Sequence, residues 1–218
     1  MKKLNVVISA GGTVEKIDQV RVVTNISTGK LGAKIANLFL SHGHTVTYVA
    51  PSSAVQPQGN DFNRIIVTNT QSVVEATRML VPKADVVIHS MAVSDFTFNI
   101  EEATKLSSDS SDAFIEHISK TITKTPKVIS YFRTWNPSAI LVGFKFTVGK
   151  TPKELMEIAK KLMVNNNLDM VLANDKTQMQ EAGAHVATLI MKDWTDRLRS
   201  KEEIAQGIYS NVVRLKGG

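Results

Sequence analysis

The stretch that decides the fold spans residues 4–49 and reads LNVVISAGGTVEKIDQVRVVTNISTGKLGAKIANLFLSHGHTVTYV. It opens with a short apolar run that ends at a glycine loop. A helical pattern follows over residues 31–39, and a second apolar run begins at Thr45. A strand, a helix and a strand in this order indicate a right-handed crossover between two parallel strands. The stretch therefore predicts the first unit of an α/β fold.

The same alternation continues along the chain. Apolar runs bounded by turn residues predict six strands: Leu4–Ile8, Thr45–Val49, Arg64–Val67, Asp85–His89, Ala139–Phe144 and Asp169–Leu172. The run AHVATLIMKDW and the following TDRLRSK predict a late antiparallel addition. We expect an α/β fold: a Rossmann-like, mostly parallel sheet with helices on both faces and an antiparallel C-terminal addition, forming one domain over residues 1–218.

Local signals place the helix ends and one loop. The capping boxes Thr151–Glu154 and Ser200–Glu203 predict helix starts, and Pro126 is expected at the first position of another helix. Gly43 is expected to end the first helix in a left-handed conformation. Residues 97–111 are polar and poor in apolar side chains, so we expect a mobile loop there.

Composition limits the classes of function. The 218 residues include no cysteine, which removes disulfides and thiolate chemistry and favours a reducing interior. The net charge of +6 is spread along the chain without interleaved aromatics, so no nucleic-acid partner is expected. No apolar run resembles a secretory signal or a membrane span. We expect a soluble, cytoplasmic protein with no membrane partner.

Several familiar motifs are absent. Gly29-Lys30 resembles the end of a Walker A loop, but Thr24 and Leu31 stand where that loop needs a glycine and a hydroxyl. No histidine spacing suits zinc, and no Gly-x-Ser-x-Gly elbow offers a serine nucleophile. The lack of Gly-x-Gly-x-x-Gly argues against an ordinary nicotinamide dehydrogenase.

Ligands of open parallel sheets lie beyond the carboxyl ends of the strands, and five segments lie there. They are Ser9–Thr13, Arg21–Gly32, Ser90–Phe96, Gly143–Lys145 and Leu172–Asp175. Each keeps two interpretations open. The glycines of the first form either a phosphate cradle or a tight turn. The second offers helix N–H groups, Arg21 and Lys30 to an anion, or only a Ser27/Thr28 cap with Gly32 for close packing.

The other segments are equally ambiguous. Asp95 binds a ribose hydroxyl or a metal, or it caps a turn. Phe144 stacks on a base or belongs to the core. Asn174 and Asp175 coordinate a ligand or cap a turn.

Taken together, the segments resemble the phosphopantothenate–cysteine ligase (phosphopantothenoylcysteine synthetase) family, in the form without a decarboxylase domain. The matching stretches are ISAGGTVEKIDQVRVVTNISTGKLG, MAVSDF, TKLSS, TKTPKVI, GFK and LDMVLAND, in family order. The resemblance implies an enzyme of coenzyme A biosynthesis that joins 4'-phosphopantothenate to L-cysteine. A nucleoside triphosphate, CTP in most bacterial members and ATP in eukaryotic ones, activates the carboxylate through an acyl-nucleotide with Mg²⁺. The resemblance does not identify the residues that would bind the metal ion.

The resemblance also assigns roles to residues. Asn25 is similar to the asparagine that holds the acyl-nucleotide, and Lys105 to the catalytic lysine on a mobile loop. Arg21 and Ala92 are similar to substrate-binding positions. The implied nucleotide-binding positions are Gly11, Gly12, Ser27, Lys30, Asp95, Phe144 and Lys161. The family implies a homodimer with shared active sites, and a separate decarboxylase is a further expected partner.

Two departures from the family pattern bear on the nucleotide. Ser107-Ser108 follow the loop lysine where many bacterial members have more basic residues, which resembles the eukaryotic loop and leaves ATP open beside CTP. The second of two family lysines falls on Asn165 or Asn166. The alternatives are a catalytically inactive nucleotide-binding regulatory protein of the same fold and, more distantly, a nicotinamide-dependent reductase.

Overall fold

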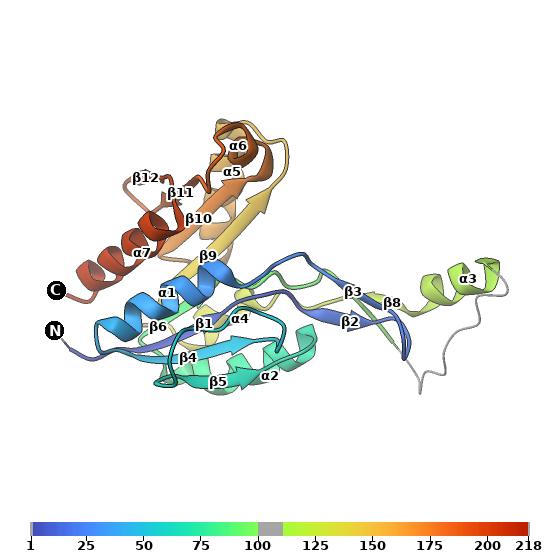
Figure 1. The fold of residues 1–218 in the computed structure, drawn as a ribbon. Helices are drawn as coiled ribbons and strands as arrows, with labels where there is room; N and C mark the ends of the chain where they lie inside the picture. The colour runs from blue at the N-terminus through green and yellow to red at the C-terminus, as the bar shows by residue number, and fades with distance from the viewer. Residues whose placement is uncertain (1, 100–110, 218) are drawn as a thin grey trace.

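The computed structural model describes residues 2–99 and 111–217 (Figure 1). Its centre is an eight-stranded sheet in the order β12-β11-β10-β9-β6-β1-β4-β5. The strands are β1 (Asn5–Ser9), β4 (Thr45–Ala50), β5 (Asn63–Ile66), β6 (Val86–His89), β9 (Ile140–Thr147), β10 (Met170–Asp175), β11 (Ala187–Ile190) and β12 (Thr195–Leu198). Six neighbouring strands, β10, β9, β6, β1, β4 and β5, pair in parallel. β11 pairs antiparallel with both β10 and β12. The predicted α/β sheet, its six strands and the antiparallel addition are confirmed.

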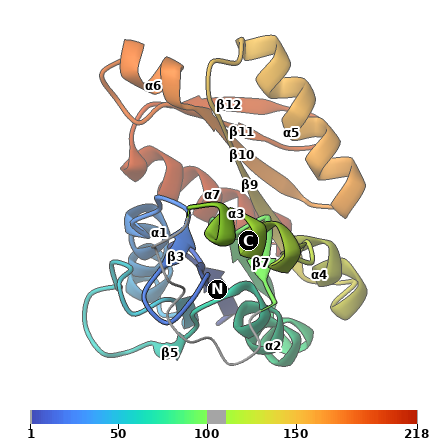
Figure 2. The same cartoon turned by 90° about the vertical axis from the view of Figure 1, so that its right-hand side faces the viewer.

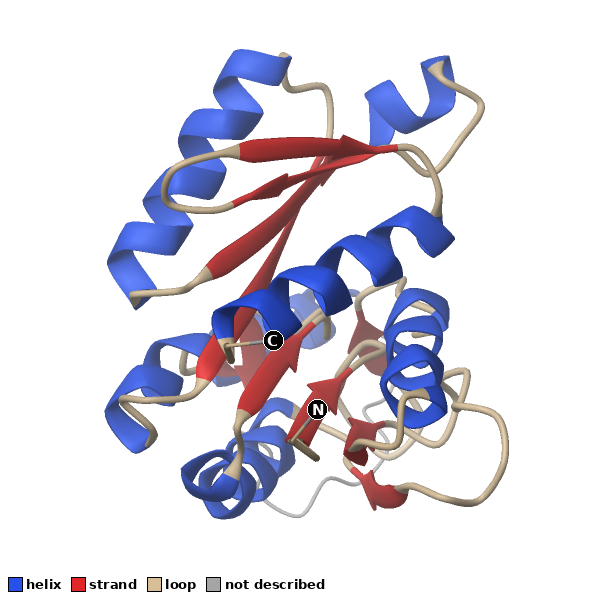
Figure 3. Cartoon of the chain, turned by 90° about the vertical axis from the view of Figure 1, so that its left-hand side faces the viewer, coloured by secondary structure: helices blue, strands red, loops and turns tan. Residues whose placement is uncertain are grey.

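Helices cover both faces of the sheet, as predicted (Figure 3). One core lies under α1 (Lys30–Ser41) and α7 (Lys201–Leu215), and a second lies under α2 (Thr70–Leu80), α4 (Ile129–Trp135) and α5 (Pro152–Asn166). The short helices are η1 (Val81–Lys83) and α6 (Lys176–Glu181). None of the helices within the described ranges is long and apolar enough to cross a membrane.

The helix signals are confirmed in part. Thr151 and Glu154 form the full capping box of α5, and Gly43 has a φ of +79° after α1. At α7, Ser200 accepts from the Glu203 N–H, but the Glu203 carboxylate accepts from Arg199 N and not from Ser200. That box is therefore shifted by one residue.

The helix start at Pro126 is wrong, because α4 begins at Ile129. Thr125 is held in an extended segment that continues from β8. Its N–H donates to Asp95 O at 3.1 Å, and its hydroxyl donates to Ser94 O at 2.5 Å. These non-local hydrogen bonds keep the chain extended where the local sequence favours a helix start.

Two hairpins and a helix project from the sheet beyond β1 and β6 (Figures 1 and 2). We call this unit the arm: the hairpin β2 (Val14–Lys16)–β3 (Val22–Thr24), the hairpin β7 (Phe96–Phe98)–β8 (Ile122–Lys124) and α3 (Ser111–Thr121). The prediction of a loop over residues 97–111 is wrong at both ends, because the first two of these residues belong to β7 and the last belongs to α3. Residues 100–110 are outside the described ranges.

The two chain ends lie together at the opposite side of the molecule (Figure 1). Asn5 N donates to the Asp85 carboxylate at 2.9 Å, and Lys216 Nζ lies 3.8 Å from the same carboxylate. Asp85 immediately precedes β6, so both ends sit at the amino-terminal edge of the parallel strands. The loops at the carboxyl edge are at the other end of these strands.

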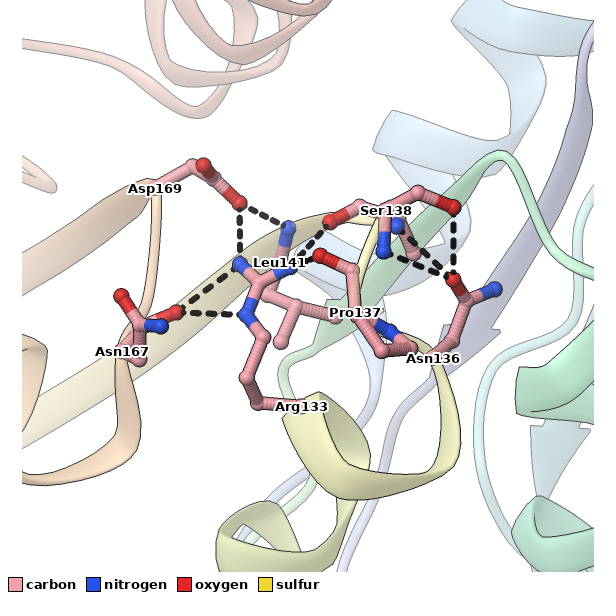
Figure 4. Close-up of polar contacts among 8 residues, drawn as sticks. Arg133, Asn136, Pro137, Ser138, Leu141, Asn167 and Asp169 are labelled. Atoms are coloured by element: carbon pink, nitrogen blue, oxygen red, sulfur yellow. Dashed lines mark hydrogen bonds and ion pairs between the residues drawn. The ribbon is translucent and has the colours of Figure 1, made fainter.

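Arg133 joins three segments at this amino-terminal edge (Figure 4). Its guanidinium donates to the carbonyl oxygens of Asn167, Pro137 and Ala139 at 2.8–3.0 Å. It also donates to Asp169 Oδ2 at 2.8 Å, and this oxygen accepts from Leu141 N. All five guanidinium N–H groups are engaged, so one side chain ties α4 to the end of α5 and to the starts of β9 and β10.

Candidate active site

The glycine loop after β1 and the loop after β6 continue the pairing of their strands. Gly12 and Ala92 form a parallel bridge. Ala92 N donates to Gly11 O at 2.8 Å, and Thr13 N donates to Ala92 O at 3.1 Å. Three of the residues selected from the sequence, Gly11, Gly12 and Ala92, are therefore neighbours at the carboxyl edge of the sheet.

Asn25 joins this group from the end of β3. Its Nδ2 donates to Val93 O at 3.0 Å and approaches Ala92 O at 3.5 Å. Its backbone oxygen lies 2.4 Å from where a Cβ on Gly12 would be, so only glycine admits this approach. The side chain is exposed, and its Oδ1 has no hydrogen-bond partner among the described residues. The asparagine amide is thus fixed on one side and open on the other.

The start of α1 lies beside the same loops, and its N-cap residue has no side chain that could cap it. The N-cap residue is Gly29, with a φ of +73°. Of the predicted Ser27/Thr28 cap, only Thr28 contributes: its hydroxyl accepts from Lys30 N at 3.5 Å, a long hydrogen bond. Ser27 N instead donates to Asn25 O at 2.9 Å. Lys30 is the first helical residue and is exposed. The free N–H groups of this first turn, together with Lys30, can receive an anion.

Gly32 brings the helix onto the strand ends. A Cβ at this position would lie 2.4 Å from the Ala10 Cβ and 2.8 Å from the Ser90 hydroxyl oxygen. The expectation that Gly32 allows close packing is confirmed. Because α1 touches the chain just after both β1 and β6, its amino terminus is directed at the candidate site.

Arg21 lies elsewhere within the same chain. It is in the turn between β2 and β3, where its guanidinium pairs with the buried Asp18 carboxylate at 3.0 Å. The guanidinium also lies 4.6 Å from the centre of the Phe114 ring in α3. Asn25 lies four residue steps beyond Arg21 along an extended segment, which is about 13 Å. A single chain therefore does not bring these two residues together.

Asp95 follows Ala92 in the loop after β6. The preceding residue, Ser94, is anchored through its N–H to Thr13 Oγ1 at 2.8 Å. Asp95 itself is exposed, and its carboxylate has no hydrogen bond or ion pair within the described part of the chain. The turn-cap interpretation of Asp95 is not supported, and its carboxylate is available to a ligand.

The remaining predicted residues are spread over other elements. Phe144 is half-buried in β9 and packs against the core under α1 and α7. Lys161 is exposed on α5, about 14 Å along the helix from its start. Lys105 lies outside the described residues. The structure therefore groups Gly11, Gly12, Asn25, Ser27, Lys30, Ala92 and Asp95 and leaves Arg21 and Lys161 apart. Phe144 directly follows Gly143, the register partner of His89, so it lies at the same edge of the sheet, level with Ser90.

Asp175 is a structural cap. Its carboxylate accepts from Thr147 Oγ1, Gly149 N and Lys150 N, and from two N–H groups at the start of α6. Burial raises the pKa of this carboxyl, but the hydrogen bonds outweigh that effect and lower the pKa to about 2. With its oxygens engaged, Asp175 is not a free ligand, and the capping interpretation is confirmed.

Ser9 and His89 lie directly beneath the site. They are register partners at the ends of β1 and β6, and 2.6 Å separates Ser9 Oγ from His89 Nδ1. His89 also packs edge-on against Phe132. The sequence shows each residue only as the last of an apolar run. Their shared position at adjacent strand ends is the signal that identifies the pair.

We predict that His89 makes the protein sensitive to mild acid. Burial lowers its pKa from 6.5 to about 4. Above pH 6.5 the imidazole is neutral in both the folded and the unfolded chain, so it does not reduce the free energy of unfolding. Between pH 6.5 and 4 only the unfolded chain takes the proton, so the free energy of unfolding falls by up to about 3 kcal/mol.

Urea unfolding at pH 7.5 and pH 5 measures this dependence. In His89→Gln the free energies of unfolding at the two pH values should differ much less than in the wild type. The glutamine still offers Ser9 a hydrogen-bonding group. The pKa values of His44 and His185 are also lowered by burial, so a smaller dependence should remain. An unchanged pH dependence in the variant would contradict the prediction.

The family model of the DNA/pantothenate metabolism flavoprotein C-terminal domain matches residues 1–215. The coenzyme A biosynthesis bifunctional protein CoaBC of Methanocaldococcus jannaschii is 31% identical over 212 residues, which cover 96% of this chain and 50% of that protein. This chain thus spans about half the length of the curated relatives it matches.

Solved structures agree with the family match. The crystal structure of the DNA/pantothenate metabolism flavoprotein from Streptococcus pneumoniae is 31% identical, with a TM-score of 0.84 over 97% of this chain and 99% of that one. A Cab2 mutant in complex with phosphopantothenate-cysteine shares the fold at 15% identity, with a TM-score of 0.75 over 99% of this chain and 89% of that one. From its fold and its family match, this chain belongs to the DNA/pantothenate metabolism flavoprotein C-terminal domain family.

Proposed function

We propose that this protein is a ligase of coenzyme A biosynthesis that joins 4'-phosphopantothenate to L-cysteine. The observation that carries the proposal is the position of Asn25, held against Ala92 and Val93 beside the amino terminus of α1. The relative from M. jannaschii is named for coenzyme A biosynthesis, and the Cab2 complex contains phosphopantothenate-cysteine, the product of such a ligase.

The reaction proceeds in two steps. The substrate carboxylate attacks the α-phosphorus of a nucleoside triphosphate, which forms an acyl-nucleotide and releases pyrophosphate. The cysteine amine then attacks the acyl carbon, the amide bond forms, and the nucleoside monophosphate leaves with the bonding electrons. The first step joins two anions, the carboxylate and the triphosphate, so charge neutralisation and positioning matter more than a protein nucleophile.

The chain's own residues have matching roles. The first turn of α1, with Lys30 and the backbone of Ser27, receives phosphate oxygens, while the glycine loop allows the ligand to approach the backbone. Asn25 lies beside the acyl-nucleotide, where its free Oδ1 can accept a hydrogen bond from the cysteine amine as it approaches the acyl carbon. We also assign activation to Lys105, on the basis of the family resemblance. CTP is the favoured nucleotide, and ATP is the alternative.

Mg²⁺ fits the site as a partner of the nucleotide. The described residues contain no group of three or more His, Cys, Asp or Glu side chains that could hold a metal. Mg²⁺ commonly binds one or two carboxylates together with substrate phosphates, and the exposed Asp95 carboxylate would be that protein ligand. The ion would supply positive charge to the triphosphate during activation.

We further propose that the protein acts as a homodimer in the cytoplasm. A single chain leaves Arg21 and Lys161 far from Asn25, and a second copy would supply such residues. The arm, together with Ile26 just beyond β3, exposes large apolar side chains that a partner could cover: Val20, Val22, Val23, Ile26 and Phe96. Analytical ultracentrifugation tests this, and a monomer at micromolar concentration would contradict it. A separate decarboxylase remains an expected partner.

The decisive experiment measures pyrophosphate release and amide product. The protein is mixed with phosphopantothenate, cysteine and Mg²⁺, with CTP in one arm and ATP in the other. Release in at least one arm is expected, and absence of release in both would reject the ligase. Thermal stabilisation by a nucleotide without turnover would indicate an inactive regulatory protein, and preferential stabilisation by NADPH would indicate a reductase.

A further inference from the structure

Glu15 is a buried carboxylate that the proposed chemistry does not use. It lies in β2 and is only 1% exposed. One oxygen, Oε1, accepts from both the N–H and the hydroxyl of Thr70, each at 2.7 Å. The other oxygen, Oε2, accepts from the Thr97 hydroxyl at 2.8 Å. Among the described residues, no lysine or arginine pairs with this carboxylate.

The negative charge of Glu15 is stabilised by a helix from another part of the chain. Thr70 is the first residue of α2, and the first turn of that helix contains no acidic residue of its own. A carboxylate at this position satisfies free N–H groups and lies at the positive end of the helix dipole. Glu15 therefore has a fixed anchor on the body of the protein.

Thr97 is the second anchor, and it lies on the other hairpin of the arm. Glu15 thus connects β2, β7 and α2, three elements that are far apart in the sequence. Neighbouring hydrogen bonds complete this junction. Val14 N donates to Thr68 O at 2.8 Å, and the Thr24 hydroxyl donates to Thr13 O at 2.9 Å.

Two residues of the candidate site lie next to this junction, each at the end of one of the two hairpins. Asn25 directly follows β3, which pairs with β2, and Asp95 directly precedes β7. A rotation of one hairpin against the other would therefore shift Asn25 relative to Ala92 and Asp95. Glu15 opposes that rotation because its two oxygens are bonded to different elements.

We infer that Glu15 is a positioning residue for the ligase reaction, holding both hairpins of the arm in the geometry that the site requires. This inference rests on the proposed function. Displacements of about 1 Å at reacting groups reduce rates by up to about a hundredfold. Glu15 exerts this effect through Asn25, Ala92 and Asp95 and does not itself touch the substrates.

Three variants test the inference, with a fourth as a matched control. Glu15→Ala should lower kcat by about a hundredfold, and Thr97→Val, which removes only the link to β7, by about tenfold. Glu15→Gln can still accept from Thr70 and donate to Thr97, so it should restore kcat to within about threefold. The control is Thr77→Val, which removes a buried threonine hydroxyl whose hydrogen bond lies within α2 and does not reach the arm.

Hydrogen exchange separates positioning from general destabilisation. In Glu15→Ala the amides of β2, β3, β7 and β8 should exchange faster, while those of β1, β4 and β6 stay protected. A wild-type kcat in both Glu15→Ala and Thr97→Val would overturn the inference, as would equal losses in Thr97→Val and Thr77→Val.

The proposed function and the role of Glu15 can be rejected independently of each other. If the wild type releases no pyrophosphate with CTP or ATP, the ligase is rejected. Exchange in the four arm strands then still decides whether Glu15 holds the hairpins, and unchanged exchange in Glu15→Ala would overturn that role as well.

Discussion

Asn25→Asp should lower the rate of amide formation by about a hundredfold or more. In the native protein Nδ2 points at the carbonyl oxygens of Val93 and Ala92, at 3.0 and 3.5 Å. An aspartate would place a negative oxygen against two carbonyl oxygens, and the side chain would turn away. The open Oδ1 would then no longer occupy the position from which it can accept a hydrogen bond from the cysteine amine.

Rapid-quench kinetics with chromatographic separation of acyl-nucleotide and amide product measures this effect. The second step should slow more than pyrophosphate release, because the groups assigned to activation are unchanged. Asn60→Asp is the matched control, since it introduces the same charge on an exposed loop outside the site. A wild-type rate of amide formation in Asn25→Asp would remove Asn25 from the mechanism.

Arg133→Met should lower the free energy of unfolding by about 2–3 kcal/mol. The substitution keeps a similar length but removes every hydrogen bond of the guanidinium. Three carbonyl oxygens and the Asp169 carboxylate lose donors at the junction of α4, α5 and β9. The guanidinium side chain is 19% exposed, so water can only partly replace these bonds.

Urea unfolding at pH 7.5 measures the loss. Arg64→Met, on the exposed edge strand β5, removes the same charge where no hydrogen bond or ion pair is formed with described residues, and it should change stability by less than about 1 kcal/mol. Arg133→Lys should lose an amount of stability between those of Arg64→Met and Arg133→Met, because one ammonium group cannot reach all the acceptors. A loss in Arg133→Met as small as in Arg64→Met would show that the junction does not depend on the guanidinium.

The sheet could be predicted because each of its parallel strands is a short apolar run bounded by turn residues. The strand-end rule then selected Gly11, Asn25 and Ala92, which the structure brings together. Both successes depend on local sequence patterns and on a general property of parallel sheets.

The arm could not be predicted for the opposite reason. Its strands have three residues each, too few for a period to appear, and β7 pairs with a segment more than twenty residues away. Glu15 appears in the sequence as one charged residue among many polar ones, and only the fold shows that it is buried. The places of Arg21 and Lys161 depend on tertiary arrangement, which no local pattern encodes.

The position of the two chain ends has a practical consequence. Both lie beside Asp85, at the edge of the sheet opposite the glycine loop and Asn25 (Figure 1). An affinity tag, a fluorescent label or a surface tether added at either end would emerge about one strand length from the candidate site. Immobilised or tagged protein should therefore keep its substrate-binding face open, and binding assays on a sensor chip can be oriented through either terminus.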